Sequence, residues 1–160
     1  MYTIQRHQTV GATIEAVWEF ISNPANLNGI TPPSLAFEIR SPVPDKMFDG
    51  LLVEYQIKIP MWGRRTWLTE IKHIRPHRSF VDEQRRGPYA FWYHYHEIRP
   101  LETGVEMLDQ VTYALPFSIL GRAVHPFFVR PLLNQIFDYR RERFSAIFPE
   151  SKPGADSQRG

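Results

Sequence analysis

The chain has 160 residues, a length at which one domain with a substantial hydrophobic core is expected. It contains no cysteine, which excludes disulfides, thiol nucleophiles, iron–sulfur clusters and cysteine-ligated zinc. The 19 basic and 17 acidic residues give a formal net charge of +2, too balanced for a protein that follows nucleic-acid phosphates. Aromatic residues make up 14% of the chain, which suggests that rings also line a cavity or a surface.

Targeting and membrane signals are weak throughout. Residues 1–7 contain no apolar segment of the kind that a secretory signal requires. The longest apolar stretch, 115–133, is interrupted by two arginines, a histidine and three prolines, so it is a poor membrane span. We therefore expect a cytoplasmic protein without a transmembrane segment. One domain over 1–148 is predicted to end in a disordered tail over 149–160, which is polar and contains Pro, Gly and Ser.

The first third of the chain predicts a strand followed by two short helices. Residues 2–10 are expected to form a first strand. Thr13 is a helix-capping residue in front of 14–21, where apolar residues recur with helical spacing. Asn23-Pro24 ends that helix and can begin a second one over 24–29.

The remainder predicts six strands and one long helix. The strands are separated mostly by Pro, Gly or Asp and are expected over 35–41, 51–59, 65–74, 78–85, 90–98 and 105–114. Thr31-Pro32-Pro33, in front of the first of them, must be extended. Helical spacing returns over 132–148, and Pro126 and Pro131 are expected to break or kink any helix before it. One helix cannot cover both faces of seven strands. The predicted fold class is therefore α+β, with a curved antiparallel sheet wrapped around the last helix.

Alternation also predicts which side chains point inward. Asp109 falls on the inner face of strand 105–114, where an unpaired carboxylate is costly. Strand 90–98 carries His94 and His96 on one face and aromatic residues on both, so its pattern alone does not decide between the faces. We place the histidines inward, because they can satisfy Asp109.

Polar and aromatic side chains of the inner face form the candidate ligand-binding site. Its members are Tyr55, Trp67, Asp82, Gln84, Trp92, His94, His96, Met107, Asp109, Tyr113 and Arg140. Strand 78–85 is ambiguous, and the face with Asp82 and Gln84 is placed inward by the same reasoning. Arg140 lies on the apolar stripe of the last helix, where its guanidinium is expected to reach Asp109 or Asp82.

Three interpretations of His94, His96 and Asp109 stay open. A His–Asp pair can act as general acid and base, which makes these residues the catalytic candidates. Two imidazoles at alternate strand positions can also ligate a metal, with Asp109 as a third ligand. Because spacing fixes nothing else of a metal site, we predict no metal and no cofactor. A hydrogen-bonded network that orders the sheet is favoured over catalysis.

Four segments carry a resemblance to a known superfamily. They are VWEFISNPANLNGITPPSLAFEI (17–39), FVDEQRRGPYAFWYHYHEI (80–98), MLDQVTYALPF (107–117) and IFDYRRERF (136–144). With the order of predicted elements, they resemble a bacterial subgroup of the START-like superfamily, which includes the Bet v 1 allergens and the polyketide cyclases. The resemblance covers 1–148. It implies the helix-grip fold, in which a hydrophobic cavity lies between the curved sheet and the last helix.

The resemblance leads to three functional hypotheses. The first is binding or transport of a hydrophobic or aromatic small molecule, such as a lipid, a quinone or a polyketide-like compound, without catalysis. The second is a polyketide cyclase or dehydratase that uses the His/Asp candidates. The third is a protein-interaction module linked to cell division, since some relatives pair a similar domain with a nucleotide-sugar epimerase-like domain. Nucleic acid is not an expected partner, whereas a homodimer and transient membrane contact stay open.

Overall fold

The structure is a computed structural model that describes residues 1–60, 62–116 and 125–150. Strand β1 (Tyr2–Val10) is followed by helix α1 (Ile14–Ser22) and two 3₁₀ turns, η1 (Pro24–Ile30) and η2 (Pro33–Leu35). Six strands come next: β2 (Glu38–Ile39), β3 (Leu51–Ile59), β4 (Gly63–Arg75), β5 (Ser79–Arg86), β6 (Phe91–Leu101) and β7 (Gly104–Ala114). The π-helical turn η3 (His125–Val129) and helix α3 (Arg130–Ile147) complete the described chain.

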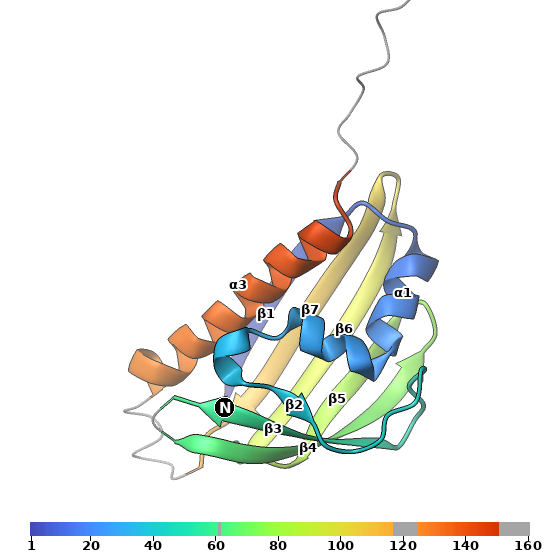
Figure 1. The fold of residues 1–160 in the computed structure, drawn as a ribbon. Coiled ribbons are helices and arrows are strands. Elements are labelled where there is room, and N and C mark those ends of the chain that lie inside the picture. Colours follow the sequence, from blue (N-terminus) through green and yellow to red (C-terminus); the bar gives the residue numbers. More distant parts are fainter. Residues whose placement is uncertain (61, 117–124, 151–160) are drawn as a thin grey trace, which may run out of the picture.

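All seven strands belong to one antiparallel sheet in the order β1-β7-β6-β5-β4-β3-β2. The sheet curves, and α1, the short helical turns and α3 all lie on the same side of it (Figure 1). The helix α3 contacts both β1 and η1. The predicted α+β class, with a curved seven-stranded sheet and a long C-terminal helix, is therefore confirmed.

Local capping explains where the first helices begin. The Thr13 hydroxyl oxygen accepts a hydrogen bond from the Ala16 amide at 3.3 Å, as expected for the residue before α1. Asn23 ends α1 with an extended backbone, and its side-chain oxygen accepts from the Ala25 amide at 2.9 Å. Pro24 then occupies the first turn of η1, where its missing N–H has no helical partner to lose.

The predicted strand over 35–41 is wrong for most of its length. Thr31 and Pro32 are extended, as expected, but Pro33 begins the turn η2. Ala36 closes this turn with a φ of 41°, in the left-handed region that interrupts a strand. Glu38 and Ile39 of β2 pair with β3, and the Arg40 and Ser41 amides after them donate to the Glu54 carbonyl of β3 at 2.8 and 3.2 Å.

The last helix begins two residues earlier than the predicted 132. Pro131 lies in its first turn, and Val129 in front of it already has helical dihedral angles. The chain therefore passes from the π-helical turn η3 into α3 with a change of helix type and no break. Because Pro131 has no N–H to donate to the carbonyl four residues earlier, a local departure from α-helical bonding is expected there.

Buried side chains form two hydrophobic clusters on the inner side of the sheet. The larger one joins the middle of the sheet to Leu133 and Phe137 of α3. The smaller one surrounds Phe144 and includes Val17 of α1. Both histidines of β6 face this interior, so their inward placement is confirmed.

Two parts of the sequence analysis fall partly beyond what the structure describes. Of the predicted tail over 149–160, only Pro149 and Glu150 are described, and the segment 117–124 of the long apolar stretch is not. Within the described ranges, no helix is both long enough and apolar enough to cross a membrane.

Candidate functional site

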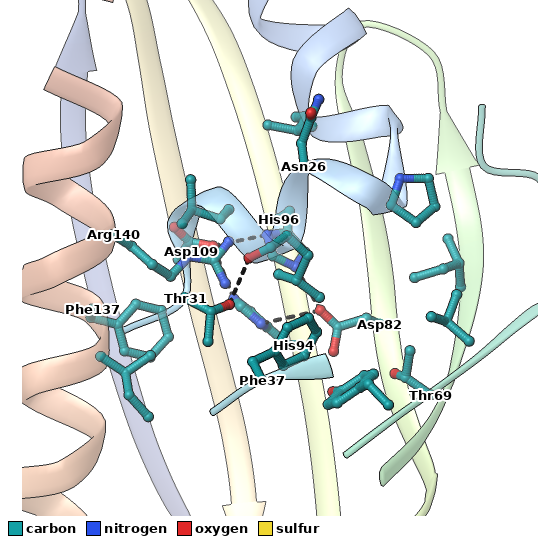
Figure 2. A pocket seen from close by; sticks show the side chains of 18 of the residues that line it. Asn26, Thr31, Phe37, Thr69, Asp82, His94, His96, Asp109, Phe137 and Arg140 are labelled. Atoms are coloured by element: carbon teal, nitrogen blue, oxygen red, sulfur yellow. Dashed lines mark hydrogen bonds and ion pairs between the residues drawn. The ribbon is translucent and has the colours of Figure 1, made fainter. Parts of the chain in front are cut away.

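A cavity of about 190 Å³ lies between the inner face of the sheet, α3 and the η1 region. Its walls are mostly apolar and aromatic, with a polar group on one side formed by Asp82, His94, His96, Asp109 and Arg140. Figure 2 shows this polar group between α3 and the sheet, with Phe37 and Thr31 nearby. Most of the residues predicted for the site thus line this cavity.

Aromatic rings build the cavity wall that lies over the middle strands. Tyr55 stacks on Trp67 with ring centroids 5.7 Å apart, and Trp67 meets Trp92 edge to face at 5.1 Å. Phe37 adds a ring 4.8 Å from Tyr55, and Tyr89 lies 4.8 Å from Trp92. Rings that fix one another in this way offer a firm apolar surface to a planar ligand.

Two histidines and two aspartates form a closed arrangement that we call the His–Asp cluster: Asp82, His94, His96 and Asp109. His94 Nε2 lies 2.9 Å from Asp109 Oδ1, and His96 Nε2 lies 2.8 Å from Asp82 Oδ2, in hydrogen-bonding geometry. The two Nδ1 atoms lie near the opposite carboxylates, at 3.2 Å for His94 to Asp82 and 2.8 Å for His96 to Asp109. Each imidazole therefore contacts both carboxylates.

The strand register explains why these four side chains meet. Asp82 is directly opposite His94 in the β5–β6 pair, and Asp109 is directly opposite His96 in the β6–β7 pair. The two well-formed hydrogen bonds run diagonally, from each histidine to the carboxylate opposite the other one. Diagonal neighbours on one face of a sheet lie within reach of side chains of this length.

The charges of the cluster support one another. Burial by itself would raise the pKa of Asp82, but the adjacent His94 and His96 more than offset it and hold that pKa below its usual range. Burial likewise would raise the pKa of Asp109, and Arg140 together with the two histidines lowers it well below the usual range. Burial would lower the pKa of His94, yet the two carboxylates raise it. The arrangement thus keeps both carboxylates ionised inside the protein.

Arg140 points from α3 toward the cluster (Figure 2), but the expected ion pair is not formed. Among the described residues no ion pair joins Arg140 to Asp109 or Asp82; its guanidinium carbon lies 6.0 Å from the centre of the Phe137 ring. Asp109 Oδ1 lies against both imidazoles instead. Arg140 acts on Asp109 through its charge, and its buried Nε has no hydrogen-bond partner in the described part of the chain.

All the predicted site residues line the cavity except Gln84 and Tyr113. The Gln84 amide holds the β5–β6 turn: its nitrogen donates to the Tyr89 carbonyl at 2.8 Å, and its oxygen accepts from the Tyr89 amide at 3.2 Å. Tyr113 packs beside Tyr2, with ring centroids 5.6 Å apart. Met107 lines the cavity from its other end, where the smaller hydrophobic cluster begins.

The predicted set did not include several residues that shape the site. Phe80 stacks on His96 with centroids 4.2 Å apart and planes 12° apart. The sequence pattern places it on the inner face of β5 together with Asp82, but the candidate site did not include it. Tyr89 follows the Gly87-Pro88 turn directly, Ile30 is the last residue of η1, and Phe37 lies between η2 and β2. Alternation rules do not reach residues in such regions.

The aromatic residues on the other face of β6 form a row outside the cavity. Phe91 and Tyr93 lie with nearly parallel rings whose centroids are 6.5 Å apart, and the Lys72 ammonium lies 6.0 Å from the Tyr93 ring centre. These side chains are half-buried along the strand.

Comparison with known proteins identifies the fold. No family model matches the sequence, and no curated protein matches it. A protein from Chromobacterium violaceum superimposes with a TM-score of 0.71 at 12% identity, covering 94% of this chain and 100% of that one. A START superfamily protein from Mycobacterium smegmatis gives a TM-score of 0.66 at 12% identity, over 92% and 99% of the two chains.

A third structure places the same fold within a longer chain. The nucleoside-diphosphate sugar epimerase from Corynebacterium glutamicum matches 88% of this chain but only 28% of its own length, with a TM-score of 0.63 at 17% identity. The chain described above therefore has a START-like, Bet v 1-like fold, as the sequence resemblance implied.

Proposed function

We propose that this protein binds or carries a hydrophobic or aromatic small molecule in the cavity between the sheet and α3. The cavity itself is the observation that supports this most directly. Its volume of about 190 Å³ exceeds that of an engineered apolar cavity of about 150 Å³ that admits benzene. The START-like fold, which generally binds hydrophobic ligands, points the same way.

Apolar contact alone does not account for tight binding in a cavity of this size. A buried aromatic ring removes about 150–250 Å² from water, worth roughly 4 to 6 kcal/mol at about 25 cal/mol per Å². The loss of translational and rotational freedom on association costs a similar amount. A well-bound ligand must therefore also use polar contacts.

The His–Asp cluster supplies hydrogen-bond acceptors at the cavity wall. The closest contacts of the two carboxylates with the imidazoles are made by Oδ2 of Asp82 and Oδ1 of Asp109. The side chains of Asp82 and Asp109 keep 20% and 16% of their surface exposed, and both line the cavity. An apolar ligand that carries a hydroxyl group, such as a phenol, a quinol or a hydroxylated polyketide-like ring, matches this arrangement.

Acid–base catalysis by the two histidines receives less support from the geometry. Every ring nitrogen of His94 and His96 lies within 3.2 Å of a carboxylate oxygen, so neither imidazole presents a free nitrogen to a substrate. We therefore propose a binding protein and not a cyclase or dehydratase. The cytoplasmic location, the homodimer and the transient membrane contact stay predictions.

Two measurements on the full chain test the proposal. Native mass spectrometry of the purified protein, followed by solvent extraction, would reveal a co-purified ligand. A thermal-shift panel of fatty acids, quinones, quinols, flavonoids and aromatic polyketides would then rank classes, because a ligand that binds only the native state raises the melting temperature. We expect hydroxylated aromatic compounds to give the largest shifts. The absence of any bound species, together with no shift from any class, would contradict the proposal.

A further inference from the structure

Three potential metal ligands converge on one point of the His–Asp cluster. Asp82 Oδ2 lies 3.2 Å from His94 Nδ1 and 2.8 Å from His96 Nε2. One donor atom from each of the three residues lies within 4.8 Å of the other two. In a tetrahedral site with bonds of about 2.0–2.1 Å, ligand atoms are about 3.3 Å apart. The two separations that involve Asp82 Oδ2 therefore differ from those of a tetrahedral metal site by only a few tenths of an ångström.

The donor types indicate which ions fit. Two imidazoles and one carboxylate suit the divalent first-row transition metals, and this combination recurs in zinc and non-haem iron sites that keep a position open. Calcium and magnesium prefer sites made of oxygen atoms, and two of the three donors here are nitrogens.

Asp109 occupies the position of an outer carboxylate in such a site. It receives the His94 Nε2–H at 2.9 Å, and His96 Nδ1 lies 2.8 Å from the same oxygen. With a proton on each of these nitrogens, His94 Nδ1 and His96 Nε2 are the ring atoms left to bind an ion, and its binding would release the proton that His96 Nε2 shares with Asp82. Metal-binding histidines are commonly oriented by an outer acceptor of this kind.

The geometry distinguishes the two carboxylates. Asp82 is the carboxylate that forms a group of possible ligands with His94 and His96, with one donor atom of each residue within 4.8 Å of the others. Asp82 is the carboxylate on the far side of the imidazoles from Asp109. This assignment differs from the ligand set weighed on the sequence alone, in which Asp109 was the third ligand.

We propose that Asp82, His94 and His96 bind one divalent transition-metal ion, with Asp109 orienting both imidazoles. All three ligands line the cavity, so a bound ion would lie at the wall of the space that the proposed apolar ligand would occupy. The metal site does not depend on the presence of that ligand. Each of the two proposals can therefore fail without the other.

Metal titrations of the full chain test the site. The protein is stripped with a chelator and titrated with ZnCl₂ by calorimetry, and with CoCl₂ by visible absorption, which reports coordination by nitrogen and oxygen ligands. We expect one ion per chain, and a higher melting temperature with Zn²⁺. Asp82→Asn and His96→Gln should each weaken binding by about 100-fold or more, whereas Asp109→Asn should weaken it by about 10- to 100-fold.

His73→Asn is the matched control, because it shows whether the loss of any one histidine weakens metal binding. His73 is exposed and has a φ of 57°, a backbone conformation that asparagine tolerates. The His73→Asn protein should bind Zn²⁺ with the same affinity as the unmodified protein. Circular dichroism identifies any variant that does not fold, and having two ligand variants keeps the test decisive. The proposed site would be overturned if the folded ligand variants bound Zn²⁺ and Co²⁺ as tightly as the unmodified protein does. It would also be overturned if the unmodified protein bound neither ion. A larger loss in Asp109→Asn than in Asp82→Asn would overturn the choice of ligands.

Discussion

His94 and His96 lie with their ring centroids only 3.8 Å apart, and each ring contacts both Asp82 and Asp109. Two imidazoles this close tolerate each other because a carboxylate lies at either end of the pair. The cluster is also wrapped in apolar surface, with Phe80 stacked on one ring and Phe137 at the edge of the other. Charged groups buried in apolar surroundings stabilise the fold only when all of their partners are present.

Removing one imidazole should therefore be costly. In His94→Leu, measured in the presence of a chelator, two largely buried carboxylates lose half of their partners. We expect the free energy of unfolding at pH 7 to fall by about 3 kcal/mol, which urea denaturation can measure. Asp109→Leu should lower the free energy of unfolding by less in the His94→Leu protein than in the unmodified protein, because the effects of the two substitutions are coupled. Strictly additive losses would show that the cluster does not act as a unit.

Tyr55 provides a pH-dependent prediction outside the cluster. Burial raises the pKa of its hydroxyl well above the ordinary value, and the negative charge of Asp82 adds to the rise. Above pH ~10 the unfolded chain releases this proton while the folded protein keeps it, so stability falls as pH rises, by about 1.4 kcal/mol per unit. Tyr55→Phe should lose about 1.4 kcal/mol less between pH 9 and pH 11 than the unmodified protein. Parallel urea-midpoint curves for the two proteins would contradict the assignment.

The cap of α1 provides a test of local structure. Thr13→Ala removes the hydroxyl that accepts from the Ala16 amide and should lower the free energy of unfolding by about 1 kcal/mol. Thr13→Ser keeps an equivalent hydroxyl and should stay within a few tenths of a kcal/mol of the unmodified protein. Equal losses in the two variants would mean that packing of the Thr13 methyl group, and not capping, stabilises the start of α1.

The sequence was sufficient for the fold because its strongest patterns are local. Alternation in 51–59 and 105–114 identifies the inner face directly, and the cap at Thr13 marks the start of a helix. Alternation alone did not orient 90–98. The charge of Asp109 did, since a buried carboxylate requires partners and only one orientation of β6 provides them. A physical requirement of one residue thus decided the orientation of a neighbouring strand.

The sequence was insufficient where the outcome depends on register or on packing. Which carboxylate meets which imidazole depends on the diagonal relationship between β5, β6 and β7, which alternation does not specify. Arg140 is a second example. The sequence correctly placed it on the inner side of the last helix, but its distance from Asp109 depends on how α3 packs over the sheet. The residues between Thr31 and Ile39 are governed by Pro33 and the left-handed Ala36, which end regular structure. The cavity volume depends on how all the surrounding side chains pack together, so no local sequence pattern predicts it.

The proposed ligand cavity can be closed by one substitution. Ile57 is buried on the inner face of β3 and lines the cavity, so the larger ring of Ile57→Trp has empty space to enter. In a fully packed core such an insertion costs about 1–3 kcal/mol. For Ile57→Trp we expect the free energy of unfolding to fall by less than about 1 kcal/mol, because the cavity accommodates the added volume.

Leu52→Trp is the matched control for Ile57→Trp. Leu52 is on the same strand but is exposed on the opposite face, so the same indole is added without entering the cavity. We expect Ile57→Trp to abolish the thermal shift produced by the best compound of the panel, while Leu52→Trp retains it. Both variants should keep the Zn²⁺ affinity of the unmodified protein, since neither substitution changes a ligand of the metal site. Retention of the thermal shift in a folded Ile57→Trp protein would place the compound elsewhere on the molecule and would remove the support that the cavity gives to the proposed function.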